Sequence, residues 1–289
     1  MIDFKKIIRH GLVGGTRYFD LRGFRLRNEM EAMQKSQRYQ HPLNLIPYGK
    51  KMYSQNDEDG IINEIFNRIG TTNKTFVELG CGNGLENNTY ALLFQNWNGL
   101  WIDGSQKNMK KINKGLPKTI LSQQLKTEHA FITKENINDL ITQHISSATI
   151  DLLSIDLDGN DAHIFDVISC IDPRVVIIEY NARFIPPVRY CMKYKSNFRW
   201  DWSDHGGASL SYLEEIAEHK GYSLVGCNLS GVNAFFIKKE LIDNKFESPF
   251  SAEKHYEPGR PYLAAIKSGH PASFQTLEDR ITNQGGLVK

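Results

Sequence analysis

The sequence predicts a doubly wound α/β fold built on a mainly parallel sheet. From Thr75 to about residue 245, short apolar runs alternate with helical patterns, as is typical of βαβ units. Hydrophobic residues make up 40% of the chain and charged residues 24%, which is ordinary for a folded domain. We therefore expect one main domain at 51–245, preceded by a helical extension at 1–50 and followed by a tail at 246–289.

Each element is predicted from its own pattern. The helix at 55–69 has its apolar residues on one face and acids ahead of them. Region 185–208 has no period and is rich in aromatic and charged residues, which favours a lid or acceptor loop. The expected strands are 75–79, 99–104, 129–132, 150–156, 174–181, 222–227 and 233–241. The expected helices among them are 88–95, 106–113, 137–145, 162–170 and 209–222.

The N-terminal extension is basic. Residues 1–49 contain nine Lys or Arg and four Asp or Glu. A short amphipathic helix is expected from Phe4, Ile7, Ile8, Leu12 and Val13. We expect it to pack on the main domain; the alternative is peripheral attachment to an anionic membrane or to a glycan-assembly partner.

Charge and cysteine content narrow the class of protein. The formal net charge is +2, so nucleic acid is not an expected partner. The four cysteines are scattered without CxxC spacing, which favours a reducing compartment. Charges interrupt the apolar start, and no run approaches the eighteen apolar residues of a membrane span. We therefore predict a cytoplasmic protein.

The segment FVELGCGNG carries the most informative functional signal. An apolar strand ends at Glu78 and continues into Gly80, Gly82 and Gly84, where the backbone can turn sharply and approach a ligand. Dinucleotide loops have the spacing G-x-G-x-x-G, whereas this loop is G-x-G-x-G. Glu78 would repel a pyrophosphate and attract the ammonium group of a methionine moiety. The alternative is a tight turn that binds no ligand.

A second acid supports a nucleoside ligand. Asp103 ends the next predicted strand about twenty residues beyond the glycines, where a carboxylate can accept hydrogen bonds from ribose hydroxyls. Nicotinamide enzymes share this feature, and Asp103 could also be a simple turn carboxylate.

Four separated segments resemble the FkbM-type branch of class I S-adenosylmethionine-dependent methyltransferases. They are ELGCGNG, IDLDGND at 155–161, IIEYN at 177–181 and the closing GYSLVGCNLSGVNAFFIKKEL. The resemblance covers about Tyr53 to Leu241. It implies a Rossmann-like seven-stranded sheet with an antiparallel last strand, S-adenosylmethionine as donor, and O-methylation of a hydroxyl on a sugar, a glycan or another small molecule. The family segment has Glu where this chain has Asp158, so the acceptor does not carry over.

The residues and the resemblance together give the expected donor site. Gln55 is assigned from the family pattern alone. The cofactor-binding candidates are Gln55, Glu78, Gly80, Gly82, Gly84, Asn88, Asp103 and Asp156.

Methylating an aliphatic hydroxyl requires that its proton leave, so a base or a metal ion is useful. The catalytic candidates are Asp158, His163 and His205, although His163 could also pack within its helix. Asp158, Glu179 and Asn181 follow adjacent strands and offer the oxygen ligands that Mg²⁺ or Mn²⁺ prefers. Alternatively, these acids bind loop backbone or acceptor hydroxyls directly.

Aromatic residues of the 185–208 insert suit stacking on a sugar face, and core packing is the alternative for some of them. They are Tyr190, Tyr194, Trp200 and Trp202.

Two other functions stay open at this stage. One is a non-catalytic nucleoside-binding module in a glycan-assembly complex. The other is an NAD-dependent oxidoreductase, which the glycine spacing and Glu78 disfavour.

Overall fold

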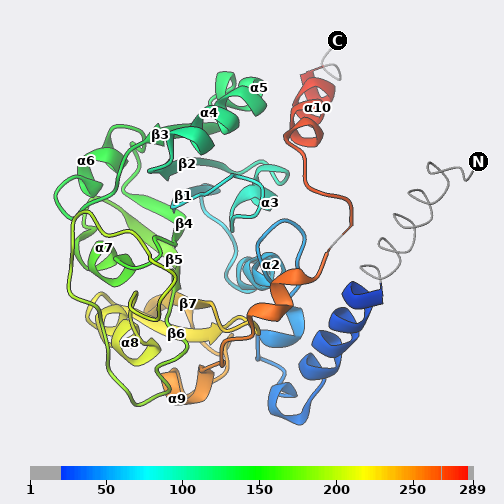
Figure 1. The fold of residues 1–289 in the computed structure, drawn as a ribbon, viewed down its shortest axis with the longest axis vertical. Helices are drawn as coiled ribbons and strands as arrows, with labels where there is room; N and C mark the ends of the chain where they lie inside the picture. Colours follow the sequence, from blue (N-terminus) through cyan, green and yellow to red (C-terminus); the bar gives the residue numbers. More distant parts are fainter. Residues whose placement is uncertain (1–20, 268, 286–289) are drawn as a thin grey trace, which may run out of the picture.

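The computed structural model describes residues 21–267 and 269–285. One seven-stranded sheet has the order β3-β2-β1-β4-β5-β7-β6 (Figure 1). β1 to β5 are parallel, and β7 runs antiparallel to both of its neighbours. The predicted doubly wound fold and its antiparallel last strand are therefore confirmed. The strands are β1 (Thr75–Leu79), β2 (Asn98–Asp103), β3 (Leu125–His129), β4 (Thr149–Ile155), β5 (Asp172–Glu179), β6 (Tyr222–Cys227) and β7 (Asn233–Lys238).

Helices cover both faces of the sheet (Figure 1). One face is covered by α2 (Glu58–Ile69), α3 (Tyr90–Leu93), α4 (Gln106–Gly115), α5 (Pro117–Leu121) and α10 (Phe274–Gly285). The other is covered by α6 (Ile137–Thr142), α7 (Asp161–Val167), α8 (Leu210–His219) and α9 (Ala252–His255). Short 3₁₀ helices are η1 (Gln37–Tyr39), η2 (Ile46–Tyr48), η3 (Lys239–Leu241) and η4 (Pro261–Ala265).

The core follows from the alternation of side chains along each strand. Val77 and Leu153 lie on one face in paired register, and both are fully buried. Their neighbours Phe76 and Leu152 point to the other face and are equally buried. Strands that are buried on both faces appear as continuous apolar runs, which explains why β1, β4 and β5 could be located from the sequence.

β3 was placed about four residues too late. The predicted strand at 129–132 includes the apolar pair Phe131 and Ile132, but β3 has the polar sequence LKTEH. β3 is an edge strand, which pairs with β2 on one side only. Its other side is not covered by a strand, so its residues can be polar. Phe131 and Ile132 lie beyond the strand and line a cleft.

The extension and the tail pack against each other. A helix over residues 21–34 is followed by η1 and η2, and its Met30 joins an apolar cluster with Leu263 and Ile266 of the tail. Tyr39 Oη donates to Glu257 Oε2 at 2.8 Å. The amphipathic positions from Phe4 to Val13 lie outside the described residues. Among the residues described, no helix is both long and apolar enough to cross a bilayer.

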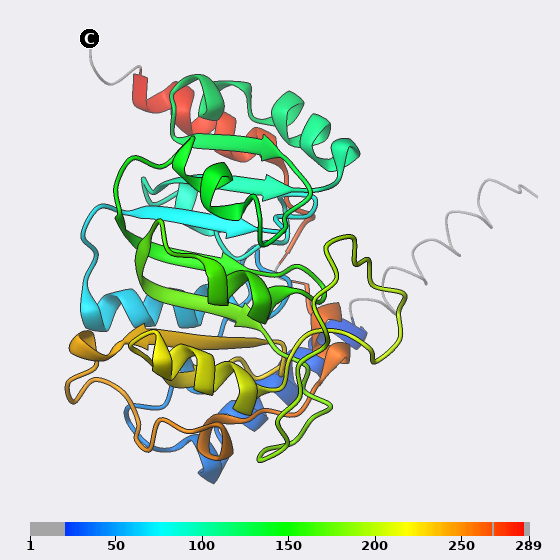
Figure 2. The same cartoon turned by 90° about the vertical axis from the view of Figure 1, so that its left-hand side faces the viewer.

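The carboxyl ends of the five parallel strands lie on one side of the molecule (Figure 2). β7 is antiparallel, so its first residue lies at the same edge, where Asn233 pairs with Glu179. Loops that leave this edge therefore bring together residues that are far apart in the sequence.

Candidate functional site

A cleft of about 1070 Å³ opens at the carboxyl edge of the sheet. Its walls come from the loops after β1, β2, β4 and β5, from the start of β7 and from the 185–208 insert. Of the eight cofactor-binding candidates, seven line this cleft: Gln55, Glu78, Gly80, Gly82, Asn88, Asp103 and Asp156.

Two glycines of the loop after β1 serve different purposes. Gly80 has φ +82°, and a Cβ there would lie 1.7 Å from the Asp156 carbonyl oxygen, so this glycine lets two loops touch. Gly82 has φ +55°, and a Cβ there would meet nothing within 4 Å. Of the two, only Gly82 therefore leaves space that a ligand can occupy.

Gly84 corrects a prediction, because it does not line the cleft. A Cβ at Gly84 would meet the side chains of Ile112 and Trp101 at 2.9 and 3.0 Å. The residue is glycine so that the loop can pack on α4 and β2.

The two acids predicted for the donor are held by backbone groups. Asp103 Oδ2 accepts from Gly82 N at 2.8 Å, and its Oδ1 accepts from Ser105 N at 2.7 Å. Glu78 accepts from Asn88 N at 2.8 Å and from the Thr89 hydroxyl. Burial raises the pKa of Glu78 to about 7, although these hydrogen bonds oppose the rise.

Asn87 was missed as a site residue. It lines the cleft and is only 8% exposed, yet neither its Nδ2 nor its Oδ1 has a hydrogen-bond partner among the described residues. Its neighbour Asn88, which was predicted, already donates from Nδ2 to Ser154 Oγ at 3.0 Å. A buried amide without partners is costly unless something satisfies it, so Asn87 is the residue of the pair that is free to bind a ligand.

Asn233 offers a second free polar atom. Its Nδ2 donates to the buried Glu58 Oε1 at 2.9 Å, while its Oδ1 has no partner among the described residues. Glu58 Oε1 accepts from the side-chain amides of both Asn233 and Asn228. Because a carboxylate oxygen must face the amide nitrogen, the Asn233 side chain is oriented with its Oδ1 free. Asn233 is far in sequence from its partner Glu58, and the Asn87 side chain has no partner among the described residues, so no local motif indicated either residue.

Three carboxylates gather where β4 and β5 end. Asp156, Asp158 and Glu179 each offer an oxygen atom within 4.8 Å of the others. Burial, followed by the charges of Asp161 and Asp158, raises the pKa of Asp156 to about 8. Burial and the neighbouring carboxylates, Asp156 first, raise the pKa of Glu179 well above its ordinary value. This set could hold a hard divalent cation.

Asn181, predicted as a metal ligand, is not in this group. Its Nδ2 donates to the Asp204 and Gly206 carbonyl oxygens at 3.1 and 3.0 Å, and its Oδ1 accepts from Arg183 N. Both ends of the amide are therefore used to shape the insert. Asp156, predicted for the cofactor, takes its place in the cluster.

Asp161 supports the loop that carries these acids. Its two oxygens accept from Leu157 N at 2.7 Å and from Gly159 N at 2.9 Å. Asp158 stands between these residues with φ +55°, a left-handed conformation that Asp tolerates better than most residues.

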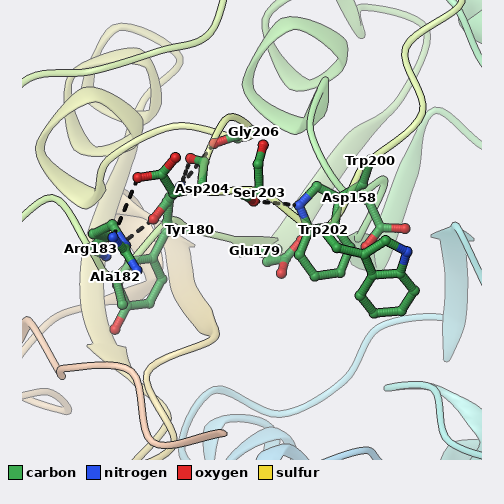
Figure 3. A pocket seen from close by; sticks show the side chains of 12 residues that line it. Asp158, Glu179, Tyr180, Ala182, Arg183, Trp200, Trp202, Ser203, Asp204 and Gly206 are labelled. Atoms are coloured by element: carbon green, nitrogen blue, oxygen red, sulfur yellow. Dashed lines mark hydrogen bonds and ion pairs between the residues drawn. The ribbon is translucent and has the colours of Figure 1, made fainter.

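A second cavity of about 360 Å³ adjoins the cleft and shares four residues with it: Asp158, Glu179, Trp200 and Trp202. Figure 3 shows these side chains together with Arg183, which pairs with Asp204 at 3.4 Å. The two indole rings lie 4.7 Å apart at 37°, and Trp202 is 83% exposed. Aromatic faces left uncovered beside carboxylates suit a polar ligand with a flat apolar side.

Tyr190 and Tyr194 do not line either cavity. Tyr190 stacks on Phe184 at 4.0 Å, and Tyr194 Oη donates to Glu135 at 3.0 Å. Packing therefore accounts for these two aromatics.

Neither predicted histidine lines the cleft or the second cavity. His163 Nε2 lies 2.7 Å from the Met192 carbonyl oxygen, which ties α7 to the insert. His205 is exposed and contacts the edge of Phe198. Proximity in sequence to the acids therefore does not place either ring in the lining of these two cavities, and a role as base stays a prediction.

The charge of the cleft limits what it can bind. Among the described lining residues, the only basic side chain is Arg199. The acidic residues that line the cleft are Glu78, Glu86, Asp103, Asp156, Asp158 and Glu179. Such a wall attracts cationic groups and repels a pyrophosphate.

No family model and no curated protein matches the chain. The chain is similar to a solved S-adenosylmethionine-dependent methyltransferase from Clostridium acetobutylicum, with 14% identity, 61% of this chain and 89% of that chain covered, and a TM-score of 0.36. It is also similar to the N-terminal domain of EvdMO1 with SAH bound (14% identity, 73% and 94% covered, TM-score 0.40). A TehB-like SAM-dependent methyltransferase from Corynebacterium glutamicum gives 17% identity, 68% and 93% covered, and a TM-score of 0.36. TM-scores of this size do not support a conclusion about activity. A proposal about the activity must therefore be based on the residues of this chain.

Proposed function

We propose that this protein is an S-adenosylmethionine-dependent O-methyltransferase of the FkbM type, acting on a hydroxyl of a sugar, a glycan or another small molecule. The observation that carries the proposal is the loop after β1. There Gly82 faces open space, its N–H is tied to Asp103, and Asn87 offers a buried amide without partners. A fold alone would not suffice, since this fold supports many functions.

The residues present fit the donor. S-adenosylmethionine combines a cationic sulfonium and an ammonium group with a ribose that has two hydroxyls. Glu78 and Asn87 would hold the methionine end, and Asp103 would accept from the ribose hydroxyls. Phe131 and Ile132 line the same cleft and offer apolar contact for the adenine. We call the loops after β1 and β2 the donor half of the cleft.

The acceptor half consists of the loops after β4 and β5, the insert at 185–208 and the start of β7. The donor already carries an activated methyl group, so the protein must mainly hold the acceptor hydroxyl in line with it and exclude water. The Trp200 and Trp202 rings would lie against a sugar face, and Asn233 Oδ1 would accept a hydrogen bond from the acceptor.

We further propose that Asp156, Asp158 and Glu179 hold a divalent cation such as Mg²⁺ or Mn²⁺. Three neighbouring carboxylates whose pKa values are all raised are a donor set that gains from a cation. When bound, the cation would lower the pKa of a nearby hydroxyl. In its absence the carboxylates would hold acceptor hydroxyls directly.

Two measurements test the proposal. Titration with S-adenosylmethionine and with NADH separates it from an oxidoreductase, because the acidic cleft should bind the first and reject the second. Mass spectrometry of host glycans and metabolites, with and without the protein, should then show an increment of about 14 Da per added CH₂, formed by transfer of one methyl group. Donor binding without any such product would instead support the non-catalytic nucleoside-binding module.

A further inference from the structure

Two large apolar side chains lie uncovered in the first part of the N-terminal helix that the structure describes. Leu21 is 59% exposed and Phe24 is 61% exposed. Their i,i+3 spacing puts them on one face of the helix. Arg22 and Arg25, which are also exposed, flank them. We call these four residues the docking face.

The other end of the same helix is anchored. Met30 is buried against Leu263 and Ile266, and Leu26 packs beside it. Arg27 donates to the Lys267 carbonyl oxygen at 2.6 Å. The tail therefore holds this end of the helix in place, whereas Leu21 and Phe24 are not part of the cluster.

The chain that precedes the docking face shares its chemistry. Residues 1–27 contain seven Lys or Arg and two Asp or Glu, interleaved with apolar residues. Basic side chains around an apolar stripe are typical of helices that lie in the interface of an anionic bilayer. The apolar side chains would enter the headgroup region, and the arginines would meet lipid phosphates.

We propose that the docking face binds the surface of a bilayer that contains anionic lipid. Charge complementarity selects this occupant. A neutral apolar partner would cover Leu21 and Phe24 but gain nothing from Arg22 and Arg25, whereas an anionic lipid surface interacts favourably with all four. The proposal does not depend on methyl transfer.

The docking face and the cleft lie on the same side of the molecule (Figure 2). Figure 2 shows that the residue 21 end of the helix lies on the same side of the molecule as the carboxyl ends of the strands. A bilayer at the docking face would therefore lie on the side where the cleft opens. Resting on the proposed function, this geometry indicates an acceptor presented at the membrane surface, such as a lipid-linked saccharide.

Co-sedimentation of the full chain with vesicles tests the proposal. Vesicles of phosphatidylcholine alone are compared with vesicles that also contain about 30% phosphatidylglycerol. Binding is expected only with the anionic vesicles and should fall as salt is raised. Leu21→Glu with Phe24→Glu should weaken binding at least about tenfold, and Arg22→Glu with Arg25→Glu should do the same.

Matched controls keep the test specific. Leu121→Glu places the same charge on an apolar side chain that is 82% exposed on α5, and Lys110→Glu with Lys111→Glu reverses two charges on α4. Both controls should bind vesicles as the wild type does. The proposal is overturned if the wild type binds neither vesicle, binds both equally, or is weakened as much by the controls. SAH binding by the docking-face variants should equal that of the wild type, so a failure here stays distinct from a failure of the proposed function.

Discussion

The two halves of the cleft hold their carboxylates in different ways. In the donor half, Glu78 and Asp103 accept hydrogen bonds from the backbone N–H groups of Asn88, Gly82 and Ser105. In the acceptor half, three carboxylates lie within 4.8 Å of one another, and their pKa values are raised. The donor half is thus organised before a ligand arrives, whereas the acceptor half concentrates negative charge that a proton or a cation must offset.

This difference separates two ways of building a site. The donor half comes from one loop and the end of the next strand, so short-range hydrogen bonds fix it. The acceptor half needs β4, β5, β7 and the insert to meet, so its geometry depends on the whole sheet. Changes in the donor half should therefore act mainly on fold and donor affinity, and changes in the acceptor half on cation binding.

The largest expected effect is the loss of stability caused by a substitution at Gly80, where the two halves of the cleft are in contact. Gly80→Ala should lower the free energy of unfolding by about 3 kcal/mol or more, because its Cβ would lie 1.7 Å from the Asp156 carbonyl oxygen. Urea denaturation measures this loss. Gly70→Ala is the control, since Gly70 has φ +67° but a Cβ there would meet nothing within 4 Å. It should cost only about 1 kcal/mol, and equal losses would show that the loop contact is unimportant.

The next largest effect should come from Glu78. Glu78→Gln should weaken SAH binding about 10- to 100-fold at about pH 8, because the ammonium group loses its charged partner. Calorimetry measures the change, and Glu253→Gln, at an exposed position outside the cleft, is the matched control.

Glu78 should also make donor affinity depend on pH. Burial raises its pKa from 4.5 to about 7, so the carboxyl is neutral below that value and ionised above it. Wild-type affinity for SAH should therefore rise between about pH 6 and 8, with proton release on binding below pH 7. The free energy of unfolding depends on pH in the opposite direction. The stabilising contribution of the neutral Glu78 carboxyl to this free energy is fully present below pH 4.5, and it is lost as the pH rises through about 7. A pH-independent affinity in the wild type would contradict this role.

A divalent cation bound in the acceptor half should stabilise the folded protein. Mn²⁺ at a hundredfold excess over its Kd should stabilise the protein by about 2.7 kcal/mol, seen as a higher Tm that EDTA reverses. Asp158→Asn with Glu179→Gln should abolish the shift, whereas Asp204→Asn, outside the cluster, should keep it. If the double variant responds to Mn²⁺ as the wild type does, the cluster is not the metal site.

The histidines should give the smallest effect. His163→Ala and His205→Ala should each leave methyl transfer within about threefold of the wild type, because neither ring lines a cavity. The assay uses the acceptor identified by mass spectrometry. His163→Ala should also lower the free energy of unfolding by about 1 kcal/mol, through loss of the bond to the Met192 carbonyl oxygen. A hundredfold loss of rate with donor affinity intact would restore either residue as the base.

Most of the fold, and most residues that line the donor half of the cleft, could be predicted from the sequence because both depend on local patterns. Buried strands are apolar runs, and the loop from Glu78 to Asp103 lies within one βαβ unit. β3 was misplaced because an edge strand has no need of apolar residues. Gly84 was assigned to a ligand because glycine spacing cannot show whether a missing Cβ makes room for a ligand or for Ile112.

The acceptor half was less predictable because long-range contacts decide it. Asn181 has the right residue type for a metal ligand, but the insert takes up both ends of its amide. Asn87 looked like an ordinary helix start, and only the burial of its unpaired amide distinguishes it. His163 and His205 stand near the acids in the chain, yet neither residue lines either cavity.

Calorimetric titration of the wild type and of Gly82→Asn with SAH tests the central claim most directly. Asn tolerates the left-handed backbone of Gly82, so the fold and the Tm should be kept while its side chain fills the open space beside Asp103. We predict one-to-one binding by the wild type and at least about a tenfold weaker Kd for Gly82→Asn. No heat with the wild type, or equal affinity in the two proteins, would contradict a donor site at this loop.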